Sequence, residues 1–162
     1  MNQELINYAS DLYSRFCMIF GDKFVKAYHN ESFVNGWINE WAESLNGIDI
    51  KYIKSGIEHC KNKLEWPPSI AEFIGICDKL SGFPTYESTL QAAIRKEFTH
   101  PIIKLTYDSV GSWSMSHDNE DILYKKFKIA YDDAVTTFRL NRMRGLPQIE
   151  PYVPENLIEL KR

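Results

Sequence analysis

The sequence has no long apolar run and no excess of positive charge. None of its 162 residues belongs to an uninterrupted stretch of 18 apolar residues, and the N-terminal segment carries Glu4 and Asp11, unlike the apolar centre of a secretory signal. The 19 basic and 22 acidic side chains give a formal net charge of -3, without the broad cationic surface that drives non-specific nucleic-acid binding. These absences predict a cytoplasmic protein without a membrane span, in which any DNA contact depends on a local patch.

Cysteine is scarce, and metal-binding motifs are missing. Cys17, Cys60 and Cys77 are an odd number at wide spacings, each among apolar neighbours, a pattern typical of buried free thiols in a reducing compartment. The four histidines form neither an H-E-x-x-H motif nor a pairing with closely spaced cysteines. We therefore predict no metal site.

Motifs for catalysis are absent as well. The sequence contains no G-x-x-x-x-G-K-[ST] phosphate-binding loop, and it contains no G-x-S-x-G nucleophile elbow. The acidic groups Asp118, Glu120-Asp121 and Asp132-Asp133 stand where a helix start or a solvated helix face carries acids. The expectation is a protein that is not an enzyme and needs no cofactor.

What the sequence does contain is apolar residues at helical spacing, with aromatic residues making up 14% of the chain. Apolar positions recur three and four residues apart along most of its length, and no segment alternates with a period of two. This predicts an all-α fold, an irregular helical bundle in two small lobes with an extended C-terminal tail. The expected core includes Phe16, Phe20, Trp37, Trp41, Ile53, Phe73, Ile74 and Phe127.

Helix breakers divide the chain. The segment 81–84, Ser-Gly-Phe-Pro, ends one helix, and Thr85 can cap the next. We expect an N-terminal lobe of four or five helices over residues 1–82 and a C-terminal lobe over residues 83–146. In the second lobe a polar loop over 111–119 should precede one long helix over 119–144, and residues 147–162 should form the tail.

The segment 66–73, W-P-P-S-I-A-E-F, predicts a rigid helix start. Ser69 and Glu72 have the S-x-x-E spacing of a capping box, and Pro67 and Pro68 restrict the backbone that leads into it. We expect Trp66 to fold back onto the helix as an aromatic plug. The alternative is that Trp66 binds a partner.

Two further features suggest binding to a partner. Trp113 and Met115 are large side chains among Gly and Ser, so they suit an interface anchor, although a tryptophan packed on its own core is the alternative. Arg139, Arg142 and Arg144 gather at the end of the long helix. They either complement the helix dipole or contact an acidic protein surface or DNA phosphate.

The order of these features resembles the phage replication protein P family, the lambda P-like helicase loaders. The resemblance covers residues 10–147, and its most specific part is the W-P-P-S-x-x-E-F segment with a following cysteine. The other matching segments are W-I-N-E-W-A-E-S-L (37–45), I-K-S-G-I (53–57), H-P (100–101), F-K-I-A-Y (127–131) and a Gly-Leu-Pro ending (145–147).

The resemblance implies a non-catalytic adaptor in the cytosol of a bacterial host. Such an adaptor binds the hexameric replicative helicase of the host and delivers it to single-stranded DNA at an origin. An origin-binding initiator and a weak contact with single-stranded DNA are further partners that the resemblance leaves open. The alternatives are a primosome adaptor of another family and a small helical DNA-binding regulator.

Overall fold

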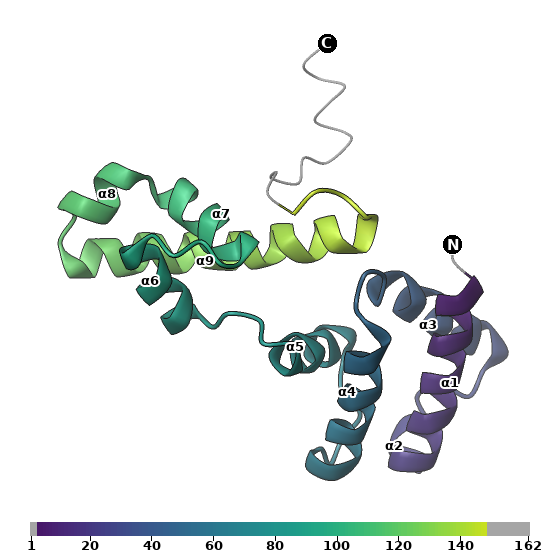
Figure 1. The fold of residues 1–162 in the computed structure, drawn as a ribbon. Coiled ribbons are helices and arrows are strands. Elements are labelled where there is room, and N and C mark those ends of the chain that lie inside the picture. Colours follow the sequence, from purple (N-terminus) through teal and green to yellow (C-terminus); the bar gives the residue numbers. More distant parts are fainter. Residues whose placement is uncertain (1–2, 149–162) are drawn as a thin grey trace. The chain divides into compact units, whose positions relative to one another are not determined.

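The computed structural model describes residues 3–148, and within them it contains nine α-helices and no strand (Figure 1). This confirms the predicted all-α fold. The helices are α1 (Gln3–Phe20), α2 (Asp22–Val25), α3 (Glu31–Ser44), α4 (Ile50–Lys63), α5 (Ile70–Leu80), α6 (Tyr86–Arg95), α7 (Pro101–Val110), α8 (Ser112–His117) and α9 (Glu120–Arg144). Within residues 3–148, none of them combines the length and the apolarity that crossing a bilayer requires.

The described chain divides into two compact units on either side of the Phe83–Pro84 bond. Unit 1 holds α1–α5, and unit 2 holds α6–α9. The break falls in the Ser-Gly-Phe-Pro segment, where Gly82 adopts a φ of 79°. The predicted tail over 147–162 lies outside the described residues from position 149 on.

Polar side chains define the starts of most helices. A side-chain oxygen or nitrogen accepts a hydrogen bond from the backbone of the first turn, which satisfies an amide that has no partner within the helix. The residues that do this are Asn30, Asp49, Ser69, Thr85, His100 and Asn119.

Unit 1 is built on an aromatic core with Phe16 at its centre. Its ring lies edge-on to five others at centroid distances of 5.4–6.0 Å, those of Phe20, Phe24, Trp37, Trp41 and Phe73. Edge-to-face rings add attraction to the burial of apolar area. The predicted core residues of this unit are buried, except that Ile74 is only partly buried at the margin.

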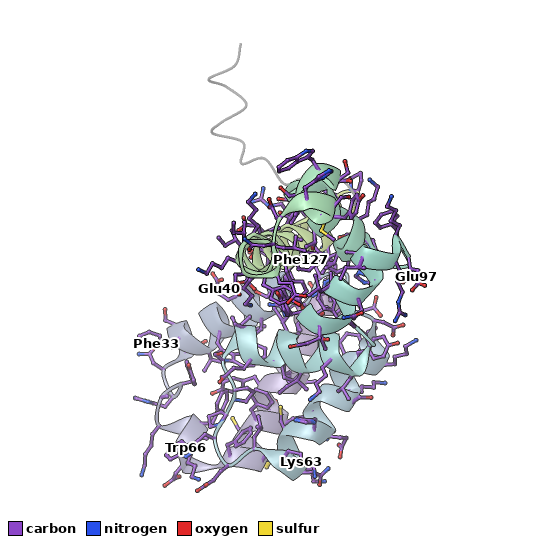
Figure 2. All side chains as sticks on the ribbon, turned by 90° about the vertical axis from the view of Figure 1, so that its left-hand side faces the viewer. Phe33, Glu40, Lys63, Trp66, Glu97 and Phe127 are labelled. Carbon is purple, nitrogen blue, oxygen red and sulfur yellow. The ribbon has the colours of Figure 1, made fainter. Side chains whose placement is uncertain are left out.

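In unit 2 the helix α7 packs along the long α9, and α6 packs on α7 (Figure 1). The buried cluster between them contains Leu90, Ala93, Ile103 and Phe127, of which Phe127 is labelled in Figure 2. The helix α9 runs over almost the predicted range and ends at Gly145, whose φ of 67° suits glycine.

One local prediction is wrong. Residues 112–117, expected within a polar loop, form the short helix α8. Gly111, with a φ of 86°, breaks α7 and redirects the chain. Met115 then packs against the unit 2 core, and this contact stabilises a helical turn that the Ser-rich sequence does not favour by itself.

Candidate functional site

The start of α5 has the capping geometry that the sequence predicts. Ser69 Oγ accepts a hydrogen bond from the Glu72 backbone N–H at 3.3 Å, and Glu72 Oε2 accepts one from the Ser69 N–H at 2.7 Å. This backbone hydrogen bond favours the ionised carboxylate and lowers the pKa of Glu72. The capping box is confirmed, and it fixes the direction from which the chain enters α5.

The prediction that Trp66 folds back onto the helix as an aromatic plug is wrong, because this residue is 63% exposed. Leu64, two residues earlier, packs against the unit 1 core, and Pro68 is buried, so these two side chains take the inner positions. Trp66 is instead held from outside by Lys23, whose Nζ lies 4.4 Å from the ring centroid. The same ammonium donates to the Glu65 carbonyl oxygen at 3.0 Å, which ties the segment to α2.

Trp66 lines an open hollow of about 880 Å³ in unit 1, which we call the Trp66 groove. One wall is the C-terminal end of α4 and the other is a face of α5, with the segment 64–68 between them. Figure 2 shows Trp66 and Lys63 at this end of the unit. The apolar lining residues are Leu64, Trp66, Pro67, Pro68, Gly75, Ile76 and Leu80, and the ionisable ones are His59, Lys63, Glu65, Glu72 and Lys79.

A second hollow of about 610 Å³ lies on the other side of the same segment. Pro67, Pro68 and Glu72 line both hollows, so the two prolines form a ridge between them. The far wall belongs to α3, where Phe33 is 65% exposed (Figure 2). Sequence analysis missed Phe33 because a single phenylalanine on a helix resembles an ordinary core position.

In unit 2 the two residues expected in a loop have different environments. Trp113 is 66% exposed and stacks on His117, with ring centroids 4.9 Å apart and planes 8° from parallel. Met115 is partly buried against the core. Lys126 holds α8 to the start of α9 by bonding Ser114 Oγ at 3.1 Å and Asp118 Oδ2 at 2.7 Å. Trp113 is therefore the more accessible of the two predicted anchors.

The three predicted arginines lie at the opposite end of α9. Arg142 places its guanidinium carbon 5.6 Å from the Phe138 ring centroid, and Arg144 is the last residue of the helix. Lys126 and Arg139 are separated by 13 residues, which corresponds to about 20 Å along a helix axis. The structure therefore does not bring the tryptophan and the arginines into one compact patch.

Metal ligands and thiols are two further kinds of candidate site in the described residues. No group of three His, Cys, Asp or Glu side chains within residues 3–148 could hold a metal ion. Cys60 and Cys77 are buried thiols that form no disulfide, as predicted, whereas Cys17 is partly exposed. Burial raises the pKa of the Cys60 thiol to about 11, so it stays protonated and is a poor nucleophile at neutral pH.

Comparison of the chain with known family models, with curated proteins and with solved structures finds no significant match. The two best candidates are the exposed tryptophans, Trp66 with its groove and Trp113 on α8. Sequence analysis missed the lysines around Trp66, which are Lys23, Lys63 and Lys79. Lysines near helix ends are common, so they give no signal of a binding site.

Proposed function

We propose that the chain is a DNA-replication helicase loader. It binds the ring of the host's hexameric replicative helicase and delivers the ring to single-stranded DNA at an origin, without catalysis of its own. The observation that carries the proposal is the W-P-P-S-x-x-E-F segment (66–73). This segment and the other matching segments occur along the chain in an order that resembles the phage replication protein P family. In the structure this segment forms a capped corner at the surface, which is compatible with that role.

The contact with the helicase is proposed on unit 2, at Trp113, Met115, Arg139, Arg142 and Arg144. Trp113 offers a large exposed ring, and tryptophan is enriched among residues that dominate binding energy. The arginines would pair with an acidic surface of the helicase. Because the two groups lie at opposite ends of α9, the helicase surface has to follow this helix for about 20 Å.

The test is complex formation in solution. The full chain and a hexameric bacterial replicative helicase are mixed with ATP, with ADP and without nucleotide, and the mass of the complex is measured by size-exclusion chromatography with light scattering. We expect a complex with the wild type and no ATP hydrolysis by the chain alone. Replacing the three arginines by glutamate should weaken binding by at least about tenfold and make the remaining binding less sensitive to salt.

The matched control is the triple variant Lys54→Glu/Lys61→Glu/Lys125→Glu. It makes the same change in net charge at exposed lysines outside the proposed contact. Both variants are checked by circular dichroism at the binding temperature. No complex under any nucleotide condition would exclude the loader function, and equal losses in the two variants would reject a specific arginine contact. Binding to duplex DNA in a gel shift, without helicase binding, would favour the regulator.

A further inference from the structure

We propose that the Trp66 groove is a docking site for an acidic amphipathic peptide segment of a partner protein. The apolar side chains of the segment lie against Trp66, Ile76 and Leu80, and its carboxylates pair with Lys63 and Lys79. All of these residues belong to unit 1. The inference is therefore independent of the helicase contact proposed on unit 2.

The charged residues of the groove determine which sign of charge a ligand should carry. Of the two acidic residues in the lining, Glu65 is paired with Lys23 at 3.5 Å, and Glu72 keeps its charge but directs its carboxylate to the Ser69 N–H at 2.7 Å. The side-chain ammonium groups of Lys63 and Lys79, in contrast, make no ion pair or hydrogen bond with any described residue. The groove thus offers unpaired positive charge above apolar walls, and carboxylates beside apolar side chains complement it.

The shape of the groove favours a peptide over a small molecule. Of the twelve lining residues only Pro68 is buried. Sites for small molecules enclose most of the ligand and orient it with a few buried polar groups. Here the charged residues Lys63, Glu65, Glu72 and Lys79 are exposed, and apart from His59 the less exposed lining residues are apolar. From Glu72 to Leu80 the groove follows nine residues of α5, a rise of about 12 Å, which matches two turns of a bound helix.

The charge of the surroundings argues against nucleic acid as the ligand. Residues 1–82 carry 8 basic and 11 acidic side chains, and only two lysines, Lys63 and Lys79, line the groove, so the cations form a local pair and not a continuous track. Single-stranded nucleic acid needs a cationic track for its phosphates in addition to an aromatic face. One face of the Trp66 ring already lies against the Lys23 ammonium at 4.4 Å.

The experiment is selection from a displayed library of random 16-residue peptides on the immobilised full chain. We expect enriched peptides to combine at least two carboxylates with apolar residues three or four positions apart. One enriched peptide is then labelled with fluorescein, and its Kd is measured by fluorescence anisotropy. The double variant Lys63→Glu/Lys79→Glu and the single variant Trp66→Ala should each raise this Kd at least about tenfold.

The matched control is Lys54→Glu/Lys61→Glu, which makes the same charge change on exposed residues of α4 that do not line the groove. It should leave the Kd within about twofold. All variants must first give the circular dichroism spectrum of the wild type. The proposal is overturned if no acidic and apolar pattern is enriched, or if the control loses binding equally. It is also overturned if a 20-residue oligo-dT binds in the groove more tightly than the peptide, since the ligand would then be nucleic acid.

Discussion

At the scale of single residues, Gly56 of α4 lies close against two side chains of α5. A Cβ at this position would lie 3.0 Å from Cys77 Sγ and 3.1 Å from Phe73 Cζ. Both neighbours are fully buried, and the Phe73 ring is confined by Trp41 at a centroid distance of 5.4 Å. Neither can move aside without disturbing the core.

We therefore expect Gly56→Ala to destabilise the protein. Overpacking costs about 1–3 kcal/mol, and the gain in helix propensity offsets about 1 kcal/mol of it, so the net loss reaches about 2 kcal/mol. Urea unfolding followed by circular dichroism measures the change. Gly36→Ala in α3 is the control, because nothing lies within 4 Å of its Cβ position. It should stabilise the protein by roughly 0.5–1 kcal/mol, and equal effects of the two substitutions would contradict the close approach.

Cys60 makes the stability of unit 1 depend on pH in the alkaline range. Burial raises its pKa from the ordinary value of 9.0 to about 11. Between these values the unfolded chain loses a proton that the folded chain keeps, so the free energy of unfolding should fall as the pH rises from about 9 to 11.

Urea unfolding at pH 8 and pH 10.5 tests this dependence. The wild type should lose more stability between the two values than Cys60→Ala does. Burial also raises the pKa of Tyr13, so part of the dependence should remain in the variant. Identical losses in the two proteins would show that the thiol does not contribute.

At the scale of elements, α5 depends on its capping box. Ser69→Ala removes the oxygen that accepts the Glu72 N–H and should cost about 1 kcal/mol in thermal or urea unfolding. Ser55→Ala is the control, since its hydroxyl only bonds the carbonyl of Lys51 within α4. A loss no larger than that of the control would mean that the cap does not stabilise the helix.

Glu72, the second residue of the capping box, should make the stability of the protein depend on pH in the acid range. The lowered pKa of Glu72 means that its contribution is present above the ordinary carboxyl value of 4.5 and is lost as the pH falls through the folded value. Thermal unfolding at pH 6 and pH 3 should therefore show a larger drop in Tm for the wild type than for Glu72→Gln. An equal drop would place the acid sensitivity elsewhere.

At the scale of the whole molecule, each unit has a core of its own. The aromatic cluster around Phe16 belongs to unit 1, and the cluster around Phe127 belongs to unit 2. Trp41→Ala should therefore weaken unit 1 selectively. The indole is buried and stacks on Trp37 at 4.4 Å, and its removal should cost roughly 3–5 kcal/mol.

Native-state hydrogen exchange with mass spectrometry separates the two units. In Trp41→Ala the amides of α1, α4 and α5 should lose protection, while those of α7 and α9 keep it. Trp113→Ala is the control for loss of an exposed ring and should change protection in neither core. Equal loss of protection in α9 and in α4 upon Trp41→Ala would contradict separate cores.

The sequence by itself determined the features that depend on local periodicity and local hydrogen bonding. The helix class, the break near Gly82, the cap at Ser69 and the end of α9 at Gly145 all follow from residues within a few positions of one another. The aromatic core of unit 1 was predicted for a related reason, since apolar residues at helical spacing must face a common interior.

The tertiary structure decided which large side chains are buried and which residues share a surface. Trp66 and Leu64 are equally plausible candidates for the core, and only the packing of the unit places Leu64 inside and Trp66 outside. The contact of Met115 with the core turns an expected loop into α8. The Trp66 groove joins the end of α4 to a face of α5, and its unpaired lysines come from both helices. Such proximity depends on how helices pack, and no local pattern encodes it.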